Sequence, residues 1–149
     1  MSRSFTAVSR KGSTLVELAV VIIIIGVLAA FGVPRYLVSV EQSKAAEAFS
    51  YLSAIRDSQE RYEAQNGAYS ADVTALDISF SAPTYFTVGT ISAGTTGSLE
   101  DSWTLTLTRQ GASAGYGAYT VTFTQLGFDS TNSTLPTVIN PKGTSGARH

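Results

Sequence analysis

An apolar run near the N-terminus that contains one charged residue limits the folds open to this chain. From Ser13 to Val33 the side chains are aliphatic, aromatic, small or hydroxylated, and the single charge is the carboxylate of Glu17. About 20 helical residues cross the ~30 Å hydrocarbon core of a bilayer, so this run predicts a helix that can span a membrane. Arg3, Arg10 and Lys11 precede it without an acidic residue, as is typical of a cytoplasmic flank.

Glu17 is the informative residue of the run, because a carboxylate near hydrocarbon is penalised by a few kcal/mol and usually marks function. If the chain were cut between Gly12 and Ser13, the new α-amino group would lie four residues from Glu17. That amine is cationic near neutral pH, so the amine of one copy could neutralise Glu17 of another. Such a pair selects register more surely than it adds stability. The alternative is that Glu17 reaches the lipid headgroups of an ordinary signal anchor.

The residues around this bond carry a specific resemblance. The sequence Lys11-Gly12-Ser13-Thr14-Leu15-Val16-Glu17-Leu18 resembles the class III signal of type IV prepilins and of type II secretion pseudopilins. The resemblance implies that a prepilin peptidase cuts between Gly12 and Ser13 and methylates the new N-terminus at Ser13. It also implies that Glu17 is the carboxylate used in assembly. The family usually has Phe where this chain has Ser13, whereas the Gly on which cleavage mainly depends is present.

Gly26 and Pro34 predict a softer stretch of the same helix. A Gly weakens a helix by about 1 kcal/mol, and a Pro removes one backbone donor. Both residues also match the Gly and Pro of the family, between which the helix can loosen inside filaments. The alternative is that Gly and Pro are common in membrane helices, where neighbouring groups tolerate them.

After Pro34 the pattern becomes that of an amphipathic helix, and we expect one helix from about Thr14 to Gln65, ended by Asn66-Gly67. Its apolar face comprises Leu37, Val40, Ala45, Ala48, Phe49, Leu52, Ile55 and Tyr62. The charged and polar residues between them are interpreted as a solvated face: Glu41, Gln42, Lys44, Glu47, Arg56, Asp57, Glu60, Arg61 and Glu63. Two pairs at four-residue spacing, Asp57 with Arg61 and Arg56 with Glu60, are expected to support the helix.

From Tyr69 onward, Thr alternates with aliphatic or aromatic residues in three segments, which predicts strands over 85–91, 103–108 and 119–124. A loop over 110–115 would join the last two. An antiparallel sheet on the C-terminal half of the helix is the economical packing, so the fold class is α+β and pilin-like. Trp103 is expected in the core rather than in a ligand site.

The chain offers little for metal binding or catalysis. Asp129 and Asn132 are weak candidates for an oxygen-rich cation site, but an ordinary turn is favoured. The sequence has no Cys and its one His is His149, so no catalytic constellation is visible and we expect neither an enzyme nor a cofactor. Many pilins fix their C-terminal tail, here residues 128–149, with a disulfide. This chain has no Cys, so hydrogen bonds or a cation must hold the tail.

These observations divide the chain into four segments. Residues 1–12 are a leader peptide to be removed, 13–34 the membrane and filament-core half of the helix, 35–66 its amphipathic half, and 67–149 a β-rich head. The resemblance implies a structural subunit of a type IV pilus-like filament. The alternatives are a type II secretion pseudopilin and a membrane-tethered binding module that does not polymerise.

The resemblance also implies partners and location. The partners are identical subunits in a helical homopolymer, the prepilin peptidase, an inner-membrane assembly platform and, before assembly, the lipid bilayer. The subunit would cross the inner membrane once with a cytoplasmic N-terminus and an exported head, and then join a surface or periplasm-spanning filament. The sequence shows no basic cluster that would indicate a nucleic-acid partner.

Overall fold

The computed structural model describes residues 12, 14–111 and 115–141 of the 149-residue chain. The chain divides between Tyr36 and Leu37 into two compact units. The longest element, helix α1, runs from Leu15 to Asn66 without interruption. Its bounds agree within one residue with the helix expected from the sequence. The predicted stop is also confirmed, because Gly67 has a φ of 76° and its N–H donates to the carbonyl of Glu63 at 2.7 Å.

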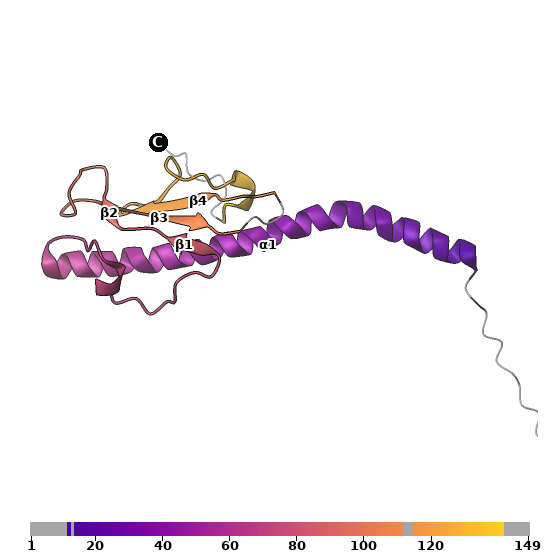
Figure 1. Cartoon of the computed structure of the whole chain (residues 1–149), viewed down its shortest axis with the longest axis horizontal. Coiled ribbons are helices and arrows are strands. Elements are labelled where there is room, and N and C mark those ends of the chain that lie inside the picture. Colours follow the sequence, from indigo (N-terminus) through magenta and orange to yellow (C-terminus); the bar gives the residue numbers. More distant parts are fainter. Residues whose placement is uncertain (1–11, 13, 112–114, 142–149) are drawn as a thin grey trace, which may run out of the picture. The chain divides into compact units, whose positions relative to one another are not determined.

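The second unit is an antiparallel sheet packed on the C-terminal half of α1 (Figure 1), so the α+β arrangement is confirmed. The strands are β1 (Phe86–Val88), β2 (Ser92–Ala93), β3 (Trp103–Arg109), β4 (Thr120–Thr124) and β5 (Gly127–Asp129). Their order is β1-β3-β4-β5, with β2 paired to β3 beside β1. Two 3-10 helices, η1 (Val73–Ala75) and η2 (Thr137–Ile139), lie in the connections.

The predicted strands over 103–108 and 119–124 correspond to β3 and β4, which pair in register with Leu105 opposite Phe123. The predicted strand over 85–91 was too long, because β1 ends at Val88. At Gly89 the chain passes so close to β3 that a Cβ would lie 2.6 Å from the carbonyl oxygen of Thr106. The strands β2 and β5 were not predicted.

The core lies between the apolar face of α1 and the inner face of the sheet. Trp103 is fully buried in it, which confirms its predicted place. Phe49 of α1 packs edge-on against Phe123 of β4, with ring centroids 5.5 Å apart. The alternate positions of β3 and β4 are Thr, and the hydroxyls of Thr106 and Thr122 are hydrogen-bonded across the strands at 2.8 Å.

The segment after β5 is held to β4 by hydrogen bonds. The N–H of Thr120 donates to the hydroxyl of Thr134 at 2.8 Å, and the N–H of Thr122 donates to the hydroxyl of Ser133 at 2.9 Å. The hydroxyl of Thr122 donates to the carbonyl of Asn132 at 2.9 Å. Side-chain hydroxyls therefore continue the edge pairing that β5 begins.

Two expectations about the charged face of α1 were wrong. Glu41 is not solvated but buried, with 1% of its surface exposed, because cationic and hydroxyl groups from the sheet region surround its carboxylate. Arg61 pairs with Asp77 at 2.8 Å rather than with Asp57, because the chain after η1 returns past the helix. The expected pair of Arg56 with Glu60 is present at 3.0 Å.

Candidate functional site

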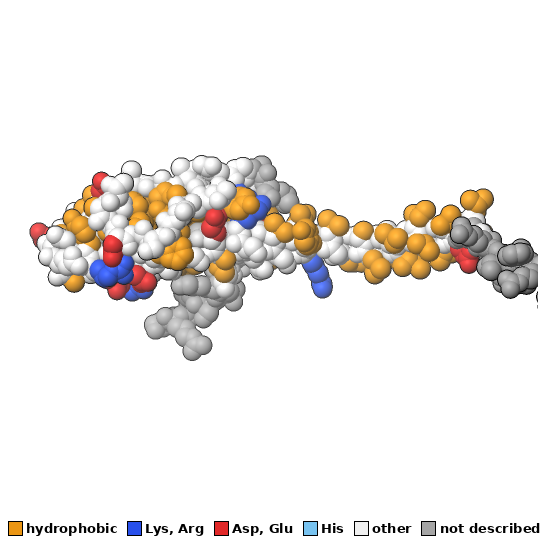
Figure 2. Space-filling view, turned by 90° about the horizontal axis from the view of Figure 1, so that it is seen from below, with side chains coloured by type: hydrophobic (Ala, Val, Ile, Leu, Met, Phe, Trp, Pro, Cys, Tyr) orange, Lys and Arg blue, Asp and Glu red, His pale blue; other side chains and the backbone are white. Residues whose placement is uncertain are grey.

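The first half of α1 presents an apolar surface that nothing within the described chain covers. Every Leu, Val, Ile and Phe between Leu15 and Val33 is 49% to 86% exposed. Figure 2 shows these apolar side chains crowding the visible face of this part of the helix. The helix is long and apolar enough to cross a membrane, with a mean hydropathy of 2.8 over its most apolar 18-residue window.

Glu17 lies in the first turn of α1, where it closes a reciprocal cap with Thr14. The N–H of Thr14 donates to Oε2 of Glu17 at 2.9 Å, and the N–H of Glu17 donates to the hydroxyl of Thr14 at 3.3 Å. This is the capping-box arrangement, which satisfies backbone donors that a helix start leaves without partners. The carboxylate also lies at the positive end of the helix dipole. The cap formed by Thr14 and Glu17 therefore stabilises the start of the helix at Leu15.

The predicted cleavage residues lie before this helix. Gly12 is exposed and precedes the first turn, while Ser13 lies outside the described residues. The helix therefore begins after the predicted cut. Cleavage between Gly12 and Ser13 and methylation of Ser13 stay predictions.

Gly26 and Pro34 both lie inside α1, and the helix passes through Pro34. A Cβ added at Gly26 would meet no atom within 4 Å, so close packing within the described chain does not require Gly there. Gly26 lowers the helix propensity of this stretch, and Pro34 lacks the backbone N–H that would otherwise donate within the helix. Their predicted role in softening the helix stays a prediction.

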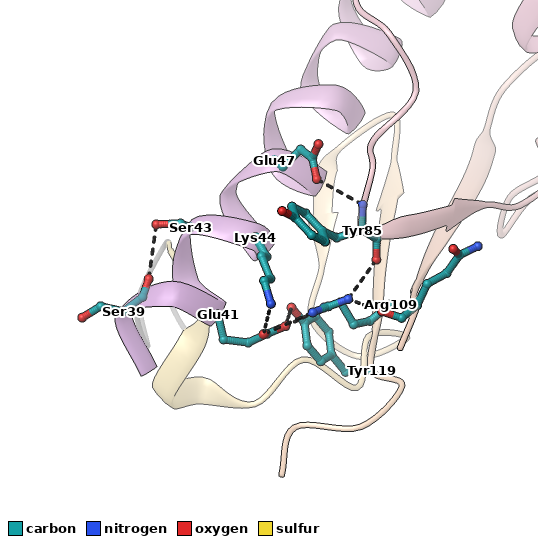
Figure 3. Close-up of polar contacts among 9 residues, drawn as sticks. Ser39, Glu41, Ser43, Lys44, Glu47, Tyr85, Arg109 and Tyr119 are labelled. Atoms are coloured by element: carbon teal, nitrogen blue, oxygen red, sulfur yellow. Dashed lines mark hydrogen bonds and ion pairs between the residues drawn. The ribbon is translucent and has the colours of Figure 1, made fainter. Parts of the chain in front are cut away.

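A buried polar cluster ties α1 to the sheet in the second unit (Figure 3). Glu41 of α1 accepts from Nε of Arg109 at 2.6 Å and from the hydroxyl of Tyr119 at 2.9 Å. Lys44 lies 3.5 Å from the same carboxylate. Arg109 is the last residue of β3 and Tyr119 immediately precedes β4. One helix carboxylate thus joins both strands that flank the β3–β4 loop.

The pKa of Glu41 is set by opposing effects of burial and of its partners. Burial disfavours the charged form of Glu41, but hydrogen bonds from Arg109 and Tyr119 and the nearby positive charges hold its pKa below the usual 4.5. Burial raises the pKa of Tyr119, and its hydrogen bond to Glu41 raises it further. Tyr119 therefore stays protonated and donates. Such a pair is expensive to form but more expensive to break, because removing one partner leaves a buried charge.

Arg109 is held on its other side by the segment that leads into β1. Its Nη1 donates to the carbonyl of Tyr85 at 3.3 Å and also to the carbonyl of Gln110. The guanidinium carbon lies 5.5 Å from the ring centroid of Tyr85 and 5.9 Å from that of Phe86. These contacts indicate a structural role for the cluster, because Glu41 and Arg109 already pair with each other.

Asp129 and Asn132 form a turn, as favoured from the sequence. The carboxylate of Asp129 accepts from the N–H of Thr131 at 2.9 Å and from Nδ2 of Asn132 at 2.7 Å. These donors hold the pKa of Asp129 below its usual value, the hydrogen bond from the Asn132 side chain being the largest cause. Among the residues that the structure describes, no three His, Cys, Asp or Glu side chains gather as a metal site.

Glu41 and Gln59, two polar residues on the buried face of α1, were not predicted to be there. The signal was present, because both continue the three- and four-residue steps of the apolar positions. The stripe runs through Leu37, Glu41, Ala45, Ala48, Leu52, Ile55, Gln59 and Tyr62. Glu41 was predicted on the solvated face because it is charged, and Gln59 was assigned to neither face. The spacing, however, places both residues with the apolar ones.

Comparison with known proteins gives fimbrial proteins and a type II secretion protein among the relatives. The chain is 39% identical to fimbrial protein EcpC of Eikenella corrodens over 69 residues, which cover 46% of this chain and 45% of that protein. It is 33% identical to type II secretion system core protein G of Pseudomonas aeruginosa over 75 residues, 50% of this chain and 53% of that protein. Type IV major fimbrial protein FimA of Dichelobacter nodosus is 45% identical over 47 residues, 32% of this chain and 29% of that protein.

The matches span about half or less of each of these relatives. No protein-family model matches the chain. These three relatives are type IV pilin-like proteins, which supports the resemblance seen in the sequence.

Proposed function

We propose that this relative of the type IV pilin-like proteins is a structural subunit of an extracytoplasmic filament, assembled through the first half of α1. The observation that carries the proposal is the exposed apolar surface from Leu15 to Val33, whose single carboxylate sits at its start. A surface of this size on one chain needs lipid or another protein to cover it. Identical helices can replace lipid around one another, so the same surface serves first as a membrane anchor and then as a filament core.

In this proposal the prepilin peptidase removes residues 1–12 by cutting between Gly12 and Ser13, and Ser13 becomes the methylated N-terminus. Before assembly the subunit crosses the inner membrane once, with its N-terminus in the cytoplasm and its β-rich head exported. An inner-membrane platform then adds it to the filament. The basic residues Arg3, Arg10 and Lys11 support this orientation. The role is structural rather than catalytic, as the names of the relatives suggest.

In the assembly step, Glu17 exchanges its cap partner for the α-amino group of a neighbouring Ser13. The carboxylate is already satisfied by Thr14 in the single chain. The free energy gained on assembly is therefore only the difference between two states, in each of which the carboxylate of Glu17 has a partner. This makes Glu17 a selector of stagger between subunits more than a source of stability.

The experiment separates the charge of Glu17 from its cap. Glu17→Gln keeps a side chain that can serve in a capping box but removes the charge, whereas Glu17→Ala removes both. We expect both variants to be made and inserted at normal levels, and both to lose polymer in the fraction sheared from the cell surface. Glu60→Gln, an exposed acidic residue on the same helix, is the control and should assemble normally. Normal polymer from Glu17→Gln would show that the charge has no part in assembly.

A second candidate is a pseudopilin of a type II secretion system, which the similarity to core protein G favours. The same preparation distinguishes the two. A pilus subunit is recovered in long filaments from wild-type cells at natural expression, whereas a pseudopilin is recovered with the cell envelope and its loss stops protein secretion.

A further inference from the structure

Two buried polar residues stand at the two ends of the apolar strip by which α1 contacts the sheet. Glu41 and Gln59 are 1% and 0% exposed. At 3.6 residues per turn they lie about five turns apart on the same face of the helix, or about 27 Å along its axis. Most of the buried residues between them are apolar, and Ala45, Ala48, Leu52 and Ile55 are fully buried. The exception is Ser58, beside Gln59, which donates to the carboxylate of Asp77.

Gln59 pairs with the backbone of the segment that follows the helix. Its Nε2 donates to the carbonyl of Ser70 at 2.8 Å, and its Oε1 accepts from the N–H of Ser70 at 2.8 Å. Both polar ends of one side chain are thus matched to both polar groups of one buried residue. A displaced helix could not keep this pairing.

Glu41 makes the corresponding contacts at the other end, with Arg109 and Tyr119, where β3 ends and β4 begins (Figure 3). All three side chains are buried. The Glu41 end is therefore hydrogen-bonded to the sheet itself, and the Gln59 end to Ser70, whose neighbour Tyr69 donates its N–H to the carbonyl of Leu99 at 2.8 Å. The other polar contacts of this half of the helix, such as that of Arg56 with the carbonyl of Gln125, are less deeply buried.

The apolar strip by itself does not define one position along the helix. Its members repeat every three or four residues, and burial of apolar surface is non-directional. A helix displaced by one turn, about 5.4 Å, would again place apolar side chains opposite the sheet. It would also leave the carboxylate of Glu41 and the amide of Gln59 buried without their partners, which is strongly unfavourable.

We propose that Glu41 and Gln59 fix the axial register of α1 against the sheet, so that the head cannot slip along the helix by a turn. This goes beyond the proposed function, because it concerns the fold of one chain and holds whether or not the chain polymerises. In a filament that bears tension along its helices, it would keep every head at the same height.

The test uses the full chain in detergent, labelled for distance measurement by electron paramagnetic resonance. The natural sequence has no Cys, so spin labels on Cys at the exposed positions Ser50 of α1 and Thr108 of β3 report register without interference. The triple variant Glu41→Leu, Arg109→Leu and Gln59→Leu removes both polar contacts and both charges of the buried ion pair while keeping apolar volume. The hydroxyl of Tyr119 and the backbone of Ser70 lose these partners but carry no charge. The control is Glu60→Gln, which removes the exposed ion pair of the same helix and leaves Arg56 to donate to the carbonyl of Gln125.

We expect one narrow distance in the natural chain and in the control. The triple variant should show an additional narrow distance, displaced as a shift of about one helical turn would produce, while fluorescence of the single Trp, Trp103, remains that of a buried indole. A triple variant with only the natural distance would overturn the proposal. A broad distribution with an exposed Trp103 would overturn it as well, because the cluster would then hold the head folded rather than in register.

Discussion

Glu17 and Glu41 are the same residue type in one helix, and their surroundings assign them different work. Glu17 lies in an exposed apolar segment and is bound by the first turn of its own helix, through Thr14. Glu41 is enclosed in the head and bound by groups from both ends of the β3–β4 loop. In the proposed assembly the first carboxylate exchanges its partner for a group of a neighbouring subunit, whereas the second keeps its buried partners within the head.

Replacing Arg109 by Met tests the cost of leaving Glu41 alone. Breaking a buried ion pair from one side costs about 3–5 kcal/mol, so we expect Arg109→Met to lower the free energy of unfolding by that order. Glu60→Met, at the partly exposed pair with Arg56, should lower it by less than about 1 kcal/mol. Urea unfolding of the full chain in detergent, followed by Trp103 fluorescence, measures both. Equal losses would contradict the buried role of the Glu41 pair.

The pH dependence of stability follows from the same carboxylate. The pKa of Glu41 is held below 4.5 in the folded chain, so its pair stabilises the fold above the unfolded pKa. That contribution is lost as the pH falls through the lowered, folded pKa. We expect the natural chain to lose more stability than Glu41→Gln between about pH 6 and about pH 3, in the same unfolding assay. Parallel losses in the two chains would show that Glu41 has the same pKa folded and unfolded.

Among the elements, α1 could be predicted almost entirely from the sequence and the sheet only in part. The helix could be predicted because its apolar residues recur at helical spacing up to the point where Asn66-Gly67 signals its end. The strands β3 and β4 were readable because Thr alternates with apolar residues along them. The strand β2 is two residues long and β5 three, too short for a period to show, and both exist because longer strands provide an edge to pair with.

The contacts between elements were the part that the sequence did not reveal. That Glu41 would meet Arg109, and Gln59 would meet Ser70, depends on which residues the fold brings together from separate parts of the chain. Periodicity marks a position on a helix face but not the polar partner that makes burial of a carboxylate tolerable. The turn at Asp129 was predictable, because its hydrogen bonds are local.

The 3-10 helix η2 gives a prediction for the C-terminal segment. Ile139 of η2 is fully buried, whereas its neighbour Val138 is 61% exposed. Ile139→Ala should therefore lower the free energy of unfolding by about 2–5 kcal/mol, the range for large-to-small changes in a core. Val138→Ala is the matched control and should change it by less than about 0.5 kcal/mol. A small loss at Ile139 would mean that η2 does not help to hold the head together.

At the scale of the whole molecule, the two units differ in whether their apolar side chains are buried within the single chain. The head buries a core of apolar residues within itself, between α1 and the sheet. The first half of α1 leaves its apolar residues exposed in the single chain. An apolar surface of this extent predicts that the chain is not stable as a dispersed monomer in water.

Processing at Gly12 is the prediction for the precursor as a whole. Gly12, Ser13 and Glu17 were identified from the resemblance of the sequence, and the structure adds that the cap formed by Thr14 and Glu17 starts the helix just after Gly12 and Ser13. Gly12→Val should leave a protein with the intact mass of the full chain, because a bulky side chain stands where the peptidase is proposed to require Gly. Lys11→Gln, a change at the neighbouring residue, is the control and should still permit cleavage. A mature mass from Gly12→Val would place the cut at another bond.

Electron cryo-microscopy of material sheared from the natural host is the decisive measurement for the filament role. We expect filaments in which copies of this chain begin at Ser13 and pack residues Leu15 to Val33 against one another in the core, with the heads outside. Finding the chain only as single copies in the membrane, with residues 1–12 still attached, would contradict that role.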